Sequence, residues 1–136
     1  MNRRSKAGFT LVELMVVAII VAILAAVAIP LFSANKKRAI ATEAQAGLGS
    51  MRTAMRVILA EHGAYNVGVT VGKLSSSNSI PGMANTDLNG RYFTNTDYEV
   101  ESVSSNAYSL KCSSSVGDAA GITIKLDDGG NWTGVP

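Results

Sequence analysis

Few residues of this 136-residue chain carry the chemistry that catalysis or metal binding needs. There is one histidine, His62, and one cysteine, Cys112. One of each excludes the common histidine-based catalytic sets, cysteine-rich zinc sites and a disulfide within the chain. With 12 Lys+Arg against 10 Asp+Glu, the net charge of +2 is also too small for a protein that binds nucleic acid through a basic field. We therefore predict neither an enzyme nor a cofactor.

Three side chains near the C-terminal end offer oxygen ligands, namely those of Asp127, Asp128 and Asn131. Carboxylate and amide oxygens are the ligands that Ca²⁺ prefers, but this spacing completes no calcium loop pattern. The intervening Gly129 and Gly130 are typical of a turn. The three residues are weak metal candidates, and an ordinary glycine-rich turn is the favoured interpretation.

Glu13 is an acidic residue within an otherwise apolar block that extends from Phe9 to Phe32. No polar residue follows it between Leu14 and Ile29. A carboxylate at mid-bilayer depth costs about 2.5 to 3.5 kcal/mol on insertion scales, and less near the edge. Glu13 therefore needs a positive partner or hydrogen bonds.

One long helix must position these residues. The apolar block is long enough as a helix to cross a hydrocarbon core of about 30 Å. Beyond it, apolar residues recur every three or four positions, and Gly63 is a typical stop signal. This apolar face consists of Ile40, Ala44, Leu48, Met51, Met55, Leu59 and His62. We place Glu43, Gln45, Arg52, Arg56 and Glu61 on the solvent face.

The predicted helix runs from about Phe9 to His62, which is longer than a small domain can cover. Its N-terminal half must therefore lie in a membrane or against other subunits. Pro30 is expected to kink or loosen the helix, and Gly47 and Gly49 are expected to make a second flexible point in it.

A basic segment before an apolar block also describes a secretory signal peptide, and Ala26-Val27-Ala28 offers a cleavage site after Ala28. In that alternative the mature chain is a secreted enzyme or binding module. Glu13 inside the apolar block and the continuation of the helical pattern both oppose it.

The second half of the chain has a different pattern. Gly63–Arg91 is rich in Gly, Ser and Asn, which predicts a surface loop with at most a short strand near Val67 to Val71. After Tyr92 the apolar period becomes two, which predicts antiparallel strands. Their inward residues are Tyr98, Val100 and Ser102, then Tyr108, Leu110 and Cys112, then Ile122, Ile124 and Leu126. The fold class is α+β, a long helix packed on an antiparallel sheet of three to four strands, onto which Trp132 folds back.

The segment Lys6-Ala7-Gly8-Phe9-Thr10-Leu11-Val12-Glu13 resembles the processing site of type IV prepilins and of the related pseudopilins of type II secretion. The shared features are a short basic leader, Gly8 before the cut, Phe9 after it, Glu13 and a long apolar helix. Ala28-Ile29-Pro30 near the end of that helix completes the pattern. The resemblance in sequence covers about Met1 to Ser33.

The resemblance implies that a membrane prepilin peptidase cuts after Gly8 and N-methylates Phe9. It also implies a single-pass precursor in the inner membrane, with its C-terminus in the periplasm. With an inner-membrane assembly platform, copies of the chain then form a helical filament. The chain divides accordingly into a leader (1–8), a membrane and filament-core helix (9–33), an amphipathic head helix (34–62), an αβ-loop (63–91) and a sheet with its C-terminal segment (92–136).

Phe9, Glu13 and Pro30 are the predicted assembly residues. The partner of Glu13 is the amine of Phe9 that cleavage creates, on a neighbouring copy or on its own chain, or else water at the bilayer edge. Lys36-Lys37-Arg38 is interpreted as a solvated face at that edge, as a partner of neighbouring subunits, or as a site for lipid headgroups or DNA. The predicted function is a pilus subunit, with a pseudopilus subunit for protein secretion as the alternative.

Overall fold

The computed structural model describes residues 8–74, 79–84, 86–134 and 136. The elements are α1 (Leu11–His62), β1 (Gly72–Lys73), β2 (Tyr98–Val103), β3 (Tyr108–Ser113), the short 3-10 helix η1 (Gly117–Ala119), β4 (Thr123–Asp127) and β5 (Trp132–Thr133). The chain divides into two compact units, of which the first ends at Asn35 and the second is Lys36–Pro136. The predicted leader, apart from Gly8, and residues 75–78 of the predicted loop lie outside the described residues.

The C-terminal end of α1 is closed by a glycine cap. Gly63 has a φ of +73°, a conformation that suits a residue without a side chain. Its N–H donates a 2.8 Å hydrogen bond to the carbonyl of Leu59, which is the pattern of a left-handed C-cap. The predicted helix stop at Gly63 is confirmed.

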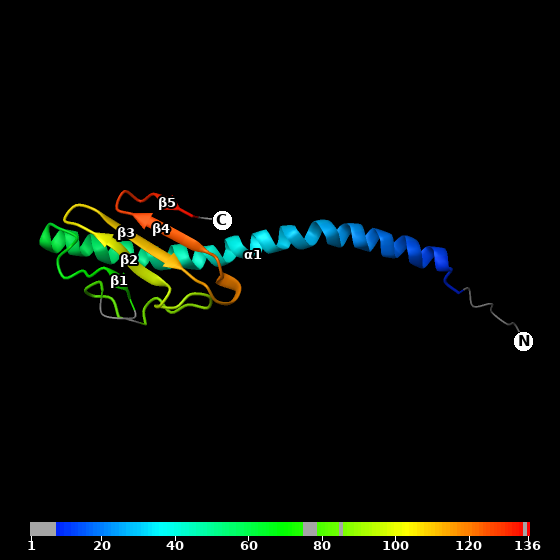
Figure 1. Ribbon diagram of the computed structural model, residues 1–136, viewed down its shortest axis with the longest axis horizontal. Helices are drawn as coiled ribbons and strands as arrows, with labels where there is room; N and C mark the ends of the chain where they lie inside the picture. Colours follow the sequence, from blue (N-terminus) through cyan, green and yellow to red (C-terminus); the bar gives the residue numbers. More distant parts are fainter. Residues whose placement is uncertain (1–7, 75–78, 85, 135) are drawn as a thin grey trace, which may run out of the picture. The chain divides into compact units, whose positions relative to one another are not determined.

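The sheet is antiparallel and its strands lie in chain order from β1 to β5. Figure 1 shows it beside the part of α1 that belongs to the second unit. The α+β prediction is confirmed, but the sheet has five strands rather than three to four. The additional strands, β1 and β5, have two residues each, too few to produce a visible alternation. The short strand expected near Val67 to Val71 instead occupies Gly72–Lys73.

The core of the second unit lies between α1 and the sheet. Its helical residues are Ile40, Ala41, Ala44, Leu48, Met51, Met55 and Ile58, and its sheet residues are Tyr98, Val100, Tyr108, Leu110, Cys112, Ile124 and Leu126, with Ile122 just before β4. The predicted face is therefore confirmed as far as Met55. Beyond it, Ile58 is buried, Leu59 is partly buried and His62 is exposed. Ile58 lies about five full turns from Ile40 and so on the same side of α1, whereas His62 is the last residue of the helix.

A β-bulge changes the direction of the side chains in β2. Val100 pairs with Leu110 and Ser102 with Ser109, so Glu101 is an extra residue on β2. The insertion ends the alternation that Tyr98 and Val100 begin. Ser102 is consequently exposed, and the prediction that it faces inward is wrong. Val103 packs against the core in its place.

The connection between α1 and β2 contributes to the core. Leu74, Ile80 and Leu88 are buried within it, and Phe93 follows with no exposed surface. The expectation of a plain surface loop was wrong in this respect. Four apolar residues scattered among Gly, Ser and Asn show no period, so the pattern could not distinguish this segment from an exposed loop.

Glu43 fixes the end of this connection to α1. Its Oε1 accepts hydrogen bonds from the backbone N–H groups of Tyr92 and Phe93, each 2.9 Å long. A β-carbon at Gly90 would overlap the Glu43 carboxylate, so glycine leaves the space that the side chain occupies. Glu43 is half-buried, and its predicted place on the solvent face is wrong. The bonded residues are about 50 positions away, beyond the reach of any local pattern.

Candidate functional site

Gly8 and Phe9 precede α1 as exposed, non-helical residues. A β-carbon added to Gly8 would have no described atom within 4 Å. No described neighbour therefore requires a glycine at this position. The side chain of Phe9 is 81% exposed. The peptide bond between the two residues is accessible to another protein.

Thr10 and Glu13 form a capping box at the start of α1. The Thr10 N–H and hydroxyl both donate to Glu13 Oε2 at 2.8 Å, and the Glu13 N–H donates to Thr10 Oγ1 at 3.3 Å. This reciprocal arrangement satisfies backbone groups that a helix leaves free at its N-terminus. This cap was not predicted, although the spacing Thr-x-x-Glu before an apolar run is its sequence signal.

In the single chain, Glu13 has no positive partner among the described residues. The nitrogen of Phe9 is a peptide nitrogen here because Gly8 precedes it. The carboxylate is instead held by Thr10. It is exposed at the N-terminal end of the helix.

The first unit presents an exposed apolar helix. From Phe9 to Phe32 every large apolar side chain is at least half exposed. α1 is the one helix among the described residues that is long and apolar enough to cross a membrane, on the criteria of length and composition. It continues through Pro30, whose missing N–H leaves the carbonyl four residues earlier without its helical donor. Apolar surface of this extent needs lipid or other protein to cover it.

The acidic residues near the C-terminal end build a turn. Asp127 Oδ1 accepts the Asn131 N–H at 2.8 Å, and the Asn131 amide bonds to both carboxylate oxygens. These bonds from Asn131 lower the pKa of Asp127. The carbonyl of Asp128 accepts a 3.5 Å bond from Arg52 on α1. Among the described residues no group of three or more His, Cys, Asp or Glu could hold a metal ion.

Cys112 is a free cysteine with no exposed surface. Burial raises the pKa of its thiol to about 12, and the negative charge of Asp97 adds to the shift. Thiolate is the reactive form, so Cys112 is unreactive at neutral pH. The prediction that this residue is a buried small apolar side chain is confirmed.

The outer face of the sheet carries paired charges. Lys111 on β3 pairs with Glu99 on β2. Lys125 on β4 bonds to Glu101 at 2.5 Å, and Ser109 donates to the same carboxylate at 2.9 Å. The bond from Lys125, and then that from Ser109, lowers the pKa of Glu101. These charges are largely neutralised within the chain.

Comparison with known proteins finds a family match in the N-terminal segment. The family described as "Prokaryotic N-terminal methylation motif" matches residues 3–29. Fimbrial protein EcpB of Eikenella corrodens is 46% identical over 56 residues, 41% of this chain and 35% of EcpB. Type IV major pilin protein PilA of Myxococcus xanthus (strain DK1622) is 42% identical over 65 residues, 48% of this chain and 29% of PilA.

One relative extends the similarity into the sheet unit. Type IV major fimbrial protein FimA of Dichelobacter nodosus is 33% identical over 106 residues, which cover 74% of this chain and 66% of FimA. No solved structure matched the chain. The methylation motif, the pilin and fimbrial relatives and the long helix on an antiparallel sheet agree with one another. The chain belongs to the type IV pilin family.

Proposed function

We propose that this chain is the structural subunit of a type IV pilus. The observation that carries the proposal is an exposed apolar helix that begins within the methylation motif. The pilin and fimbrial names of the three relatives favour a pilus over a secretion pseudopilus. A secreted module released after Ala28 is disfavoured, because that cut would fall inside α1 and expose a new end within the helix.

The precursor resides in the membrane through the first half of α1, with the sheet unit outside the bilayer. A prepilin peptidase cuts the peptide bond between Gly8 and Phe9 and methylates the new amine. The lack of contacts around Gly8 and the exposure of Phe9 support access to this bond. Cleavage adds a positive charge near Glu13, which alters the electrostatics at the start of α1.

Assembly then transfers α1 from lipid to other copies of the chain. The apolar side chains supply most of the attraction without selecting one position along the helix. A single charge pair between Glu13 and the Phe9 amine of a neighbour sets the register, as a buried polar residue does in a coiled coil. Phe9, Glu13 and Pro30 are the assembly residues in this proposal.

Intact mass and N-terminal sequencing of protein from sheared filaments test this function. A chain that begins at methylated Phe9 and is the main component of the filaments is the expected result. A mature chain that begins at Ile29 would contradict it. Gly8→Val is the informative variant, since a side chain there meets nothing in the folded subunit. It should accumulate as an uncut membrane precursor, whereas Gly49→Ala, another open glycine, should be processed normally.

A further inference from the structure

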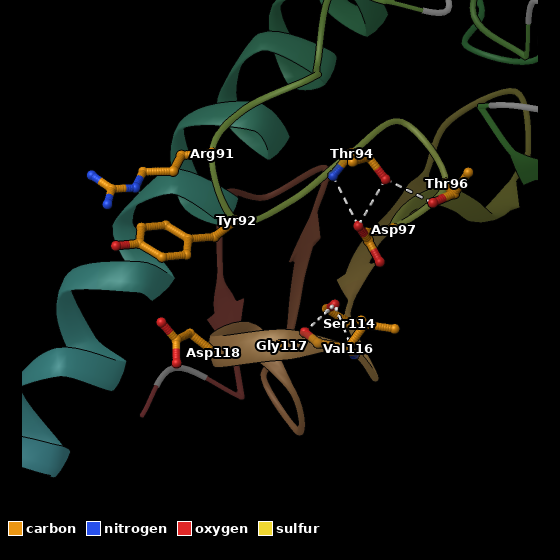
Figure 2. Close-up of a pocket in the computed structure, with 9 residues that line it drawn as sticks. All are labelled: Arg91, Tyr92, Thr94, Thr96, Asp97, Ser114, Val116, Gly117 and Asp118. Carbon is orange, nitrogen blue, oxygen red and sulfur yellow. Dashed lines mark hydrogen bonds between the residues drawn. The ribbon is translucent and has the colours of Figure 1, made fainter.

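A cavity of about 550 Å³ lies in the sheet unit between two connecting segments. One wall is the end of the α1–β2 connection, from Arg91 to Asp97, and the other is the β3–β4 connection, from Ser114 to Asp118. Figure 2 shows Asp97 and Asp118 on these different walls. Neither carboxylate is needed by the proposed processing step or by the register of the apolar helices.

Both walls are attached to α1. Glu43 bonds to the backbone of Tyr92 and Phe93 in the first wall. Lys36 forms a 2.8 Å ion pair with Asp118 Oδ2 in the second wall. The cavity is therefore held at a defined position along the helix, next to Lys36 and within the same compact unit. A cavity fixed in this way can take part in a specific contact between copies.

Two carboxylates, those of Asp97 and Asp118, are among the groups that line the cavity. The N–H and hydroxyl of Thr94 bond to Asp97 Oδ2 at 2.8 and 3.1 Å, which fixes the carboxylate and leaves Oδ1 with no partner among the described residues. Asp118 uses only Oδ2 for Lys36. The guanidinium of Arg91 lies 5.4 Å from the centre of the Tyr92 ring and extends away from Asp97 in Figure 2. The open carboxylate oxygens suit a cation that donates hydrogen bonds.

The chain supplies such cations beside the cavity but directs them elsewhere. Successive side chains on an α-helix are separated by about 100° around its axis. Lys36 pairs with its own Asp118, so Lys37 and Arg38 lie about 100° and 200° around α1 from the side that faces the cavity. Both are exposed, and neither has an ion pair within the part of the chain that the structure describes.

We propose that in the filament the cavity receives the Lys37–Arg38 pair of a second copy. This inference rests on the proposed pilus function. The cavity and the basic pair are different surfaces of one chain, so the contact is heterologous, and in a filament it can repeat from copy to copy. The Lys36–Asp118 ion pair places the cavity beside the turn of α1 that carries Lys37 and Arg38. In copies with parallel helices, the cavity of one copy and the basic pair of the next therefore lie at similar positions along the helix axis. The basic pair thereby gives the sheet units a register of their own.

Cysteine cross-linking in sheared filaments tests the contact. Thr96→Cys, on an exposed residue of the cavity wall, is combined with Lys37→Cys so that Asp97 and Arg38 remain. A short bismaleimide should give a ladder of dimers and larger multimers, while each single variant gives no ladder. Cys112 contributes little background, because it is buried and its thiol is protonated. Lys37→Cys with Glu61→Cys, near the other end of α1, is the control pair and should give no ladder.

Charge reversal provides a second test with an independent readout. Arg38→Asp should lower the amount of sheared filament roughly tenfold or more at normal membrane levels of the processed chain. Arg38→Asp with Asp97→Arg should recover part of that loss, and Arg56→Asp, an exposed cation elsewhere on α1, should have little effect.

Normal filaments from Arg38→Asp, or double-cysteine filaments without a ladder, overturn the contact while the pilus function stands. If the double-cysteine chain does not assemble, the charge reversal alone decides. Wild-type cells without filaments that contain this chain would overturn the proposed function itself.

Discussion

The phenol of Tyr98 lies directly against the backbone of Gly47, so close that a β-carbon at position 47 would overlap the ring. Tyr98 is 1% exposed and is among the largest side chains of the core. Burial raises the pKa of its hydroxyl above its ordinary value, with Cys112 as the next cause. Gly47 therefore leaves room for the Tyr98 ring and allows β2 to approach α1, rather than only making the helix flexible at this point.

Gly47→Ala should lower the free energy of unfolding by about 1 to 3 kcal/mol, because overpacking exceeds the gain in helix propensity. Gly49→Ala is the matched control, since its added carbon meets nothing within 4 Å. It should instead stabilise the helix by about 0.5 to 1 kcal/mol. Denaturant unfolding followed by circular dichroism measures both. Equal effects of the two substitutions would show that Tyr98 does not limit the space at Gly47.

A chain of residues 34–136 should fold without the apolar half of α1. The helical face from Ile40 to Ile58 buries its side chains against the sheet within the second unit, and every described member of the core cluster belongs to that unit. We expect helical and β signals in circular dichroism and a cooperative thermal transition. A non-cooperative melt would mean that the sheet unit depends on the rest of α1 for its stability.

Glu43→Ala should destabilise this unit, because two backbone N–H groups at the buried Phe93 and its neighbour Tyr92 lose their acceptor. The loss expected for such unsatisfied groups is about 1 to 3 kcal/mol. Glu43→Gln keeps a carbonyl oxygen in place and should lose less. Glu61→Ala, on an exposed residue of the same helix, is the control and should be nearly neutral. Urea midpoints of the four proteins order these effects.

The elements that the sequence predicts well are those in which the pattern of apolar residues repeats many times. The helix from Leu11 to His62 and the three longer strands repeat their pattern often enough to be recognised. The two-residue strands β1 and β5 do not, and the bulge at Glu101 has no local signal. The role of Glu43 arises from contacts about 50 residues away, which only the fold brings together. The Thr10–Glu13 cap, in contrast, was visible in the sequence.

Acid should weaken the sheet unit partly through Glu101. Its pKa is lower in the folded chain, because Lys125 and Ser109 bond to the carboxylate. A group with a lowered folded pKa stabilises above its unfolded pKa, near 4.5, and loses this contribution as pH falls through the folded value. The unfolding free energy of the wild type should therefore fall between about pH 5 and pH 3.

Glu101→Gln removes this titration, so its stability should decline less over the same range. The decline will not vanish, since Asp127 also has a lowered pKa through its bonds from Asn131. Urea unfolding at several pH values gives the two slopes. Parallel curves for wild type and variant would rule out Glu101 as a source of the acid sensitivity.

Glu13 should matter for filament assembly far more than for processing or for the fold of the sheet unit. In the single chain, loss of its carboxylate costs only the helix cap that it forms with Thr10. In a filament, loss of the carboxylate would leave the amine of a neighbour's Phe9 buried without a partner, at a typical cost of about 3 to 5 kcal/mol for each contact. The second cost recurs with every added subunit.

Three substitutions separate the two roles of this carboxylate. Glu13→Ala removes both, so the chain should be processed and membrane-resident but scarce in sheared filaments. Thr10→Ala weakens the cap and leaves the charge, so filaments should form at near-normal levels. Glu13→Gln keeps the shape and a hydrogen-bond acceptor without the charge and should fall between them. Immunoblots of membrane and sheared fractions, with electron microscopy, compare the three. Equal filament losses from Thr10→Ala and Glu13→Ala would assign the effect to the helix cap, and normal filaments from Glu13→Ala would remove the carboxylate from assembly altogether.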